Sequence, residues 1–239
     1  FLNSYVTMKI SFANFLAELC EKTPGANVDT VTKILGSDSR INGKYLKGGL
    51  GFGGPCFPRD NQAISYFSKK MGVKAHLALA TDKINNSQIK RVIRIVENLV
   101  PHESKISVLG LSYKPDTAAI EESQAVMIAD ILSRTHKVSV YDPAAMENCR
   151  KILGRKVQYA SSMKECVRGT KAIILATPWK EFDELFKGNA GEQKRQLDFL
   201  EKRITCHWVI STEKYRLGYE KNKKGARLWC WRIYRAPPG

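Results

Sequence analysis

The sequence predicts an α/β protein with an all-helical first part, residues 1–100, followed by a parallel α/β second part, residues 101–239. Two observations carry this prediction. Apolar residues recur at helical spacing up to Pro101, and from about residue 105 short apolar segments of strand length alternate with helical segments. A glycine- and proline-rich turn at residues 51–60 interrupts the helical part and holds a single cysteine.

The first part is expected to contain four helices. The first apolar stripe consists of Ile10, Phe12, Phe15, Leu16 and Leu19. It predicts a helix that ends near Pro24-Gly25. A second, shorter helix is expected from Val28, and a third from about Asp60 to Lys70, with Asp60 opening it. A long fourth helix is expected from about His76 to Leu99, just before Pro101.

The second part has the period of a parallel α/β sheet. The expected strands are Ile106–Leu111, Val138–Tyr141, Val157–Tyr159 and Ile173–Thr177, with helices near 122–134 and 144–152 between them. Parallel sheets bind ligands beyond the carboxyl ends of their strands, and Gly110-Leu-Ser-Tyr113-Lys114 leaves the first strand at that edge. This turn is not a GxGxxG loop, so it does not predict a dinucleotide site. A lysine there suits a diphosphate.

Composition narrows the class of protein. The longest apolar runs are far shorter than the roughly 20 residues that a bilayer requires, so no membrane partner is expected. The chain begins at Phe1 without an initiator Met or a signal peptide, which predicts a start inside a longer protein. Its six cysteines form no CxxC pair, so no metal site is predicted. Scattered cysteines are typical of a reducing, cytoplasmic location.

The net charge of +16 raises a nucleic-acid hypothesis. Residues 201–239 alone hold ten Lys/Arg against three Asp/Glu, and no nucleic-acid-binding motif accompanies them. Solvated charge and attraction of a phosphate ligand are therefore favoured over nucleic acid, which stays an alternative partner.

The turn Gly51-Phe-Gly-Gly-Pro-Cys56-Phe-Pro-Arg59-Asp60 is built as a reactive thiol would be. Its glycines permit unusual backbone angles and close approach of a substrate, and its prolines stiffen the turn. A helix beginning just after Cys56 would favour a thiolate. The other interpretation is a buried structural cysteine.

This segment resembles the active-site signature of the UDP-glucose/GDP-mannose dehydrogenase family, and the likeness extends over most of the chain. Upstream, Asn3-Ser-Tyr-Val-Thr-Met-Lys-Ile-Ser-Phe and Gly36-Ser-Asp-Ser-Arg40-Ile-Asn-Gly-Lys44-Tyr45-Leu-Lys47 resemble the family's central helices and substrate loop. Downstream, Val108-Leu-Gly-Leu-Ser-Tyr113-Lys114-Pro-Asp-Thr, Glu121-Glu-Ser and Tyr141-Asp-Pro resemble its nucleotide-sugar domain.

The resemblance implies a central helical dimerisation domain followed by a Rossmann-like domain that binds a nucleotide sugar, with a homodimer as the assembly. It implies the oxidation of UDP-glucose at C6 to UDP-glucuronate by two NAD⁺, a reaction of polysaccharide biosynthesis. Cys56 would form a thiohemiacetal and then a thioester. Asp60 would move protons or position water, and Asn3 would orient the reacting oxygen.

The resemblance also implies a set of binding residues. The expected substrate-binding residues are Arg40, Lys44, Tyr45, Lys47, Phe52, Gly53, Tyr113 and Lys114. Arg40 would reach the site of a partner subunit, and for Lys44 and Tyr45 an ordinary surface role stays equally open. Arg59 and Glu121 are expected near the cofactor, although Glu121 replaces an arginine that is common in the family.

The family's NAD domain, with its GxGxxG loop, would precede Phe1, so the isolated chain is expected not to turn over. The tail from about residue 213 matches no family pattern. UDP-N-acetylmannosamine and GDP-mannose stay open as substrates. Alternatives from other classes are a non-catalytic nucleotide-sugar-binding or dimerising remnant and a basic nucleic-acid-binding module.

Overall fold

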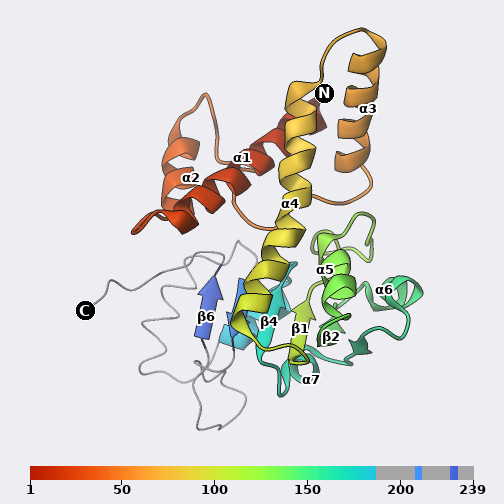
Figure 1. Ribbon diagram of the computed structural model, residues 1–239. Helices are drawn as coiled ribbons and strands as arrows, with labels where there is room; N and C mark the ends of the chain where they lie inside the picture. Colours follow the sequence, from red (N-terminus) through yellow and green to blue (C-terminus); the bar gives the residue numbers. More distant parts are fainter. Residues whose placement is uncertain (187–207, 212–226, 231–239) are drawn as a thin grey trace. The chain divides into compact units, whose positions relative to one another are not determined.

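The computed structural model describes residues 1–186 and the backbones of two further strands, 208–211 and 227–230 (Figure 1). It divides into two compact units, Phe1–Arg91 and Val92–Cys230. The division falls within helix α4, His76–Leu99. The domain boundary expected near residue 100 stays a prediction. Within the described residues, none of the helices is long and apolar enough to cross a membrane.

The first unit consists of helices, as the sequence predicts. They are α1 (Leu2–Lys22), α2 (Val28–Ser37), α3 (Phe57–Lys70) and the first part of α4. Asn27 caps α2, because its side chain accepts the N–H groups two and three residues further on. Helix α3 begins three residues earlier than expected, since the Cys56 carbonyl already accepts the Asp60 N–H at 2.9 Å. Asp60 therefore lies in the first turn and does not open the helix.

The apolar stripe of α1 is not its buried face. The buried residues are Thr7, Ser11, Ala13, Asn14 and Ala17. Phe12, Phe15 and Leu19 keep 45–46% of their surface exposed. An apolar stripe ordinarily faces the core. Here small and polar residues do so, because the backbone packs closely against α1: a Cβ added at Gly48 would lie 2.8 Å from the Ala17 Cβ.

A buried ion pair joins α4 to the end of α1 within this unit. Arg91, whose side chain is 3% exposed, pairs with Glu21. The Arg91 guanidinium also donates to the Gln88 side chain at 3.2 Å. Charged groups that are removed from water need such partners. The Arg91–Glu21 pair therefore links α4 to the end of α1.

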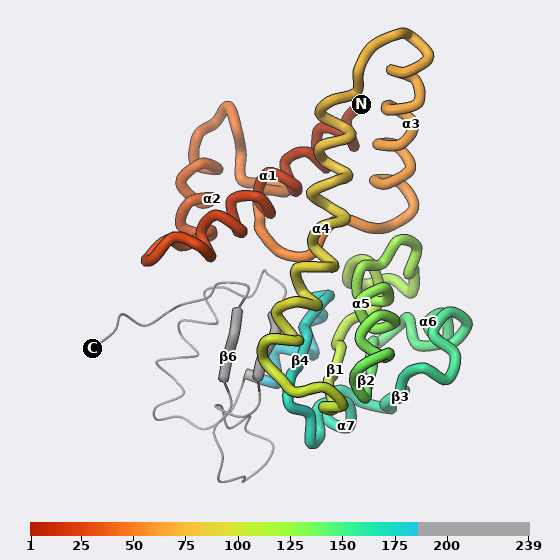
Figure 2. The backbone as a smooth tube through the Cα atoms, viewed as in Figure 1, coloured from red at the N-terminus to blue at the C-terminus, as the bar shows by residue number. Residues whose placement is uncertain are grey.

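The second unit is built on a sheet with strand order β3-β2-β1-β4-β5-β6 in the described chain. The strands are β1 (Lys105–Leu109), β2 (Lys137–Tyr141), β3 (Gln158–Tyr159), β4 (Ala172–Leu175), β5 (Trp208–Ser211) and β6 (Arg227–Cys230). The helices are α5 (Gln124–Leu132), α6 (Met146–Leu153), α7 (Met163–Val167) and the 3-10 helix η1 (Lys180–Phe186). Figure 2 traces the chain from β1 through α5 to β2, and through α6 to β3.

The first four strands are parallel, as predicted. Two further strands, for which the sequence predicts no direction, extend the sheet at one edge: β5 pairs antiparallel to β4, and β6 antiparallel to β5. Apolar residues of a short strand carry no signal for its direction, which is set by pairing. The tail from about residue 213, apart from β6, lies outside the described residues.

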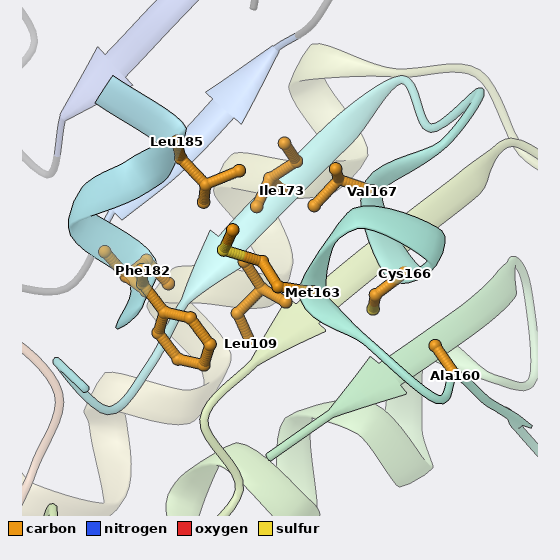
Figure 3. Packing of buried hydrophobic residues seen from close by; sticks show 9 residues of the cluster. Leu109, Ala160, Met163, Cys166, Val167, Ile173, Phe182 and Leu185 are labelled. Atoms are coloured by element: carbon orange, nitrogen blue, oxygen red, sulfur yellow. The ribbon is translucent and has the colours of Figure 1, made fainter. Parts of the chain in front are cut away.

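The core of this unit covers β1 and β4. Figure 3 shows side chains of α7 and η1, among them Met163, Cys166 and Phe182, packed on Leu109 and Ile173 of the sheet. All five are at most 5% exposed. This packing fixes the carboxyl ends of β1 and β4 side by side.

Those two carboxyl ends form the switch point of the sheet. The chain moves from β1 to β2 on one side and returns to β4 on the other, which opens a ligand edge between β1 and β4. Gly110 leaves β1 with a φ of +82°, and a Cβ there would lie 2.5 Å from the Thr177 carbonyl oxygen. Only glycine fits this exit.

The stability of the second unit should fall in mild acid because of His136. This side chain is 6% exposed, and its ring meets that of His102 edge-on at 5.8 Å between centroids. Burial, and then the neighbouring His102, lower the pKa of His136, whereas Glu97 and the Ser104 backbone oppose the shift. The unfolded chain therefore binds the proton first, and stability falls as the pH drops below about 6.5.

We expect the free energy of unfolding in urea to decrease from pH 7.5 to 5.5, and His136→Leu to reduce that decrease. The matched control is His76→Gln, because His76 is exposed. It should keep the pH dependence of the parent chain. An equal pH dependence in all three proteins would contradict the assignment.

Candidate functional site

Cys56 ends the glycine turn and is the N-cap residue of α3. It is exposed, and its backbone angles are φ −101° and ψ −49°. Gly54, two residues before it, has a φ of +81°, which a side chain would strain. The Cys56 side chain makes no capping hydrogen bond to this helix start, which carries partial positive charge.

A carboxylate and an amide lie beside this helix start. Asn3 of α1 donates its side-chain N–H to the Asp60 carboxylate at 2.7 Å, and Arg59 donates to the other carboxylate oxygen at 3.0 and 3.1 Å. The hydrogen bond from Asn3, followed by that from Arg59, lowers the pKa of Asp60. The structure thus brings Asn3 together with Arg59 and Asp60, although Asp60 lies 57 residues further along the chain. The sequence prediction places Arg59 near the cofactor, and Asn3 and Asp60 at the reacting group.

Arg59 is oriented by this cluster. The hydrogen bond to Asp60 is the main cause that raises the pKa of Arg59, and Cys56 contributes to the same shift. The Arg59 guanidinium therefore binds the Asp60 carboxylate and lies close to the Cys56 thiol. A cofactor contact of Arg59 stays a prediction.

Buried amides hold the turn in place. The Phe52 N–H donates to the Asn85 side chain at 2.7 Å, and the Asn85 amide donates back to the Phe52 carbonyl at 3.0 Å. Asn14 accepts from the Gly49 N–H at 2.6 Å. Each pairing satisfies backbone groups that an irregular turn cannot pair itself.

An aromatic chain links the turn to the preceding loop. The rings of Tyr45 and Phe52 both meet Phe57 edge-on, at centroid distances of 6.3 and 6.2 Å. Phe52 is 6% exposed and Tyr45 is 53% exposed, so Phe52 belongs to the support and Tyr45 to the surface. Gly53, which lies between Phe52 and Cys56 in the sequence, is half-buried.

The cations of the preceding loop face solvent. Arg40 pairs with Asp38 at 2.6 Å, and the pKa of Asp38 is lowered by that contact. Lys44 and Lys47 are exposed. Lys9 of α1 holds the loop by donating to two of its carbonyls at 2.8 and 2.9 Å. Among the described contacts, none is a hydrogen bond or ion pair from these three loop cations to Cys56.

The second unit offers a separate set of residues at the exit of β1. Lys114 is exposed, with its amine 5.6 Å from the centroid of the half-buried Tyr113 ring. The Tyr113 N–H closes the loop on the Ala119 carbonyl at 3.1 Å. Glu121 is exposed in the turn before α5.

Two residues of this edge, Asp142 and Trp179, were missed by the sequence predictions of the site. The Asp142 carboxylate accepts the Leu111 N–H at 2.6 Å, and Trp179 donates its indole N–H to the same oxygen at 3.2 Å. The position of Asp142 directly after the second strand was the signal in the sequence that could have identified it. Across residues 1–186 and the two outlying strands, no group of His, Cys, Asp and Glu could hold a metal ion.

Comparison with known proteins identifies the family of the two units. Residues 1–87 match the central domain, and residues 107–203 the UDP-binding domain, of the UDP-glucose/GDP-mannose dehydrogenase family. Relatives include UDP-glucose 6-dehydrogenase YwqF of Bacillus subtilis, 32% identical over 76% of this chain and 42% of that protein. UDP-glucose 6-dehydrogenase AglM of Haloferax volcanii is 35% identical over 91% of this chain and 49% of that protein.

Among solved structures, a UDP-glucose dehydrogenase from the archaeon Pyrobaculum islandicum matches with a TM-score of 0.74 and 32% identity. The match covers 79% of this chain and 44% of that one. The chain thus spans less than half the length of these relatives. Two family domains in the same order, together covering most of the residues, establish the relationship. The chain belongs to the UDP-glucose/GDP-mannose dehydrogenase family.

Proposed function

We propose that the chain provides the catalytic thiol and the nucleotide-sugar site of a UDP-glucose 6-dehydrogenase. The observation that carries this proposal is the placement of Cys56 at the N-terminus of α3, next to the Asn3–Asp60 hydrogen bond. Curated relatives named UDP-glucose 6-dehydrogenase support UDP-glucose as the substrate. UDP-N-acetylmannosamine and GDP-mannose are the competing substrates.

The thiol would act on the C6 aldehyde of the sugar. The Cys56 thiol loses its proton, its sulfur forms a bond to C6, the carbonyl π electron pair moves to oxygen, and that oxygen takes up a proton from water to give a thiohemiacetal. Because hydrogen bonds lower its pKa, Asp60 is a carboxylate at neutral pH and acts as a proton acceptor or as an acceptor for water. It is poorly suited to donate the proton. Asn3 orients this carboxylate by its hydrogen bond.

The family's cofactor, NAD, is the hydride acceptor of the oxidation. The described residues do not fit a dinucleotide. The exit of β1 lacks a GxGxxG loop, and the acid after β2, Asp142, is already occupied by backbone N–H groups. We therefore propose that the chain by itself does not reduce NAD⁺. Among the described cysteines, Cys56, Cys149 and Cys166 form no disulfide bond, which fits a reducing compartment such as the cytoplasm.

A homodimer is proposed from the outer face of α1. Tyr5, Phe12 and Leu19 lie seven residues apart, and Phe15 adjoins Phe12 with 6.4 Å between ring centroids. Each of the four is about half exposed. A long apolar stripe left uncovered on a helix is typical of a helix–helix interface.

The homodimer predicts that Phe15→Glu produces a monomer, because a charge would be buried in the interface without a partner. Sedimentation velocity of the parent chain should show a dimer. Ile152→Glu is the matched control, since Ile152 is 57% exposed on α6 of the other unit. A parent that sediments as a monomer, or a Phe15→Glu variant that stays dimeric, would contradict the proposal.

The thiol assignment predicts selective alkylation of Cys56. Burial raises the pKa of the Cys149 thiol to about 12 and that of Cys166 to about 11, so both should resist iodoacetamide until the chain unfolds. Cys56 is exposed and should react at least about tenfold faster than either. Peptide mass mapping during the reaction follows each cysteine separately, and Cys56→Ser should remove the fast site. Similar rates for all three would refute the assignment.

Calorimetric titration tests the nucleotide-sugar site. We expect saturable binding of UDP-glucose and UDP in preference to GDP-mannose, and a loss of about tenfold or more in affinity with Lys114→Ala, because a phosphate loses a charged partner. Lys137→Ala is the matched control, since Lys137 is exposed at the amino end of β2, opposite the ligand edge. It should bind as the parent does.

The alternatives give different titrations. Equal binding of DNA with a steep salt dependence and no nucleotide selectivity would favour the nucleic-acid module. UDP-selective binding together with an unreactive Cys56 would favour a non-catalytic nucleotide-sugar-binding remnant.

A further inference from the structure

The carboxylate of Asp142 is buried at the ligand edge of the second unit. It follows β2 directly and is 1% exposed. In dinucleotide-binding folds an acid at the end of the second strand accepts the ribose hydroxyls of the ligand. The environment of Asp142 assigns it a different task.

Protein donors occupy both oxygens of this carboxylate. One oxygen accepts the N–H groups of Leu111 and Ser112 at 2.6 and 2.9 Å, the Ser112 hydroxyl at 3.0 Å and the Trp179 indole N–H at 3.2 Å. The other accepts the N–H groups of Ala144 and Ala145 at 2.8 Å each. A carboxylate has about four lone-pair directions, so six donors leave no acceptor for a ligand.

These donors come from three different segments. Leu111 and Ser112 leave β1, Trp179 follows β4, and Ala144 and Ala145 precede α6. Thr177, also after β4, adds a second tie, because its hydroxyl donates to the Ser112 carbonyl at 2.5 Å. Asp142 therefore joins the exits of both strands that border the switch point.

The segment that Asp142 holds leads directly to the residues expected at the nucleotide sugar. Ser112 is 1% exposed and fixed from three sides, and the chain then emerges at Tyr113 and at the exposed Lys114. A lysine binds phosphate well only if its backbone is held where the phosphate lies, since its own side chain is flexible. Ser112, which Asp142 holds, lies two residues before Lys114.

We propose that Asp142 is the positioning residue of the nucleotide-sugar site: it fixes the Leu111–Ser112 segment that presents Tyr113 and Lys114, and it does not contact the ribose. This inference rests on the proposed function of the second unit. In this proposal the acid after β2 holds the backbone of the protein and does not accept ribose hydroxyls. Trp179, which donates to the same carboxylate, supports the same segment.

The test is UDP binding to the whole chain by titration calorimetry, with Asp142→Asn. Asparagine keeps the size but replaces one oxygen by an N–H₂ group, which must face N–H donors in either orientation. We expect affinity for UDP to fall about tenfold or more, equally for UDP and 2′-deoxy-UDP. In the Lys114→Ala background the further loss should be less than about threefold, because the two residues act through one contact.

Two controls separate positioning from loss of the fold. Ser139→Ala changes a buried residue on the same strand away from the edge, and should bind as the parent does. Trp179→Phe keeps an aromatic ring and removes one donor to Asp142, so it should weaken UDP binding by a smaller factor while leaving circular dichroism and thermal unfolding unchanged. Trp179→Phe carries the test if Asp142→Asn does not fold, and unaltered binding by it would then overturn the proposal.

The remaining outcomes are decisive. A folded Asp142→Asn chain that binds UDP within about twofold of the parent overturns the inference alone, as does a loss that is additive with Lys114→Ala. A larger loss for UDP than for 2′-deoxy-UDP would make Asp142 a ribose ligand instead. If the parent chain binds no UDP, the proposed function and this inference fall together.

Discussion

Irregular backbone next to a ligand must find hydrogen-bond partners outside its own segment, and both units meet this constraint with buried polar side chains. Asn85 pairs with both backbone groups of Phe52 in the glycine turn, and Asp142 pairs with two successive N–H groups at the exit of β1. Unpaired buried backbone groups cost free energy comparable to a lost hydrogen bond. These side chains therefore stabilise the turns that carry Cys56 and Lys114.

Environment separates residues of the same type. Asp60 and Asp142 both accept several hydrogen bonds, yet Asp60 is half-buried beside the thiol whereas Asp142 is enclosed by six donors. Among the described cysteines, Cys56 is exposed at a helix N-terminus, and Cys149 and Cys166 are buried with raised pKa values. Chemical reactivity thus depends on position in the fold, and position sets Cys56 apart from the buried cysteines and Asp60 apart from the enclosed Asp142.

Helix α1 shows how burial can reverse an expectation from periodicity. Its large apolar side chains face outward, while alanine, serine, threonine and asparagine face the turn and α4. Close approach of the backbone at Gly48 requires small side chains on that face. The outward stripe is then available to another surface, which is the physical basis for the proposed dimer.

The sequence by itself determined the order of helices and strands, the position of the thiol turn and the family. Local spacing, glycine and proline carry that information within a few residues, which is why α4 and β1 lie close to their expected bounds. Tertiary structure decided what depends on residues far apart in the chain. The contact of Asn3 with Asp60 spans 57 residues, and the antiparallel pairing of β5 depends on its neighbour β4. The task of Asp142 was likewise invisible beforehand, because its donors follow three separate elements that only folding brings to one point.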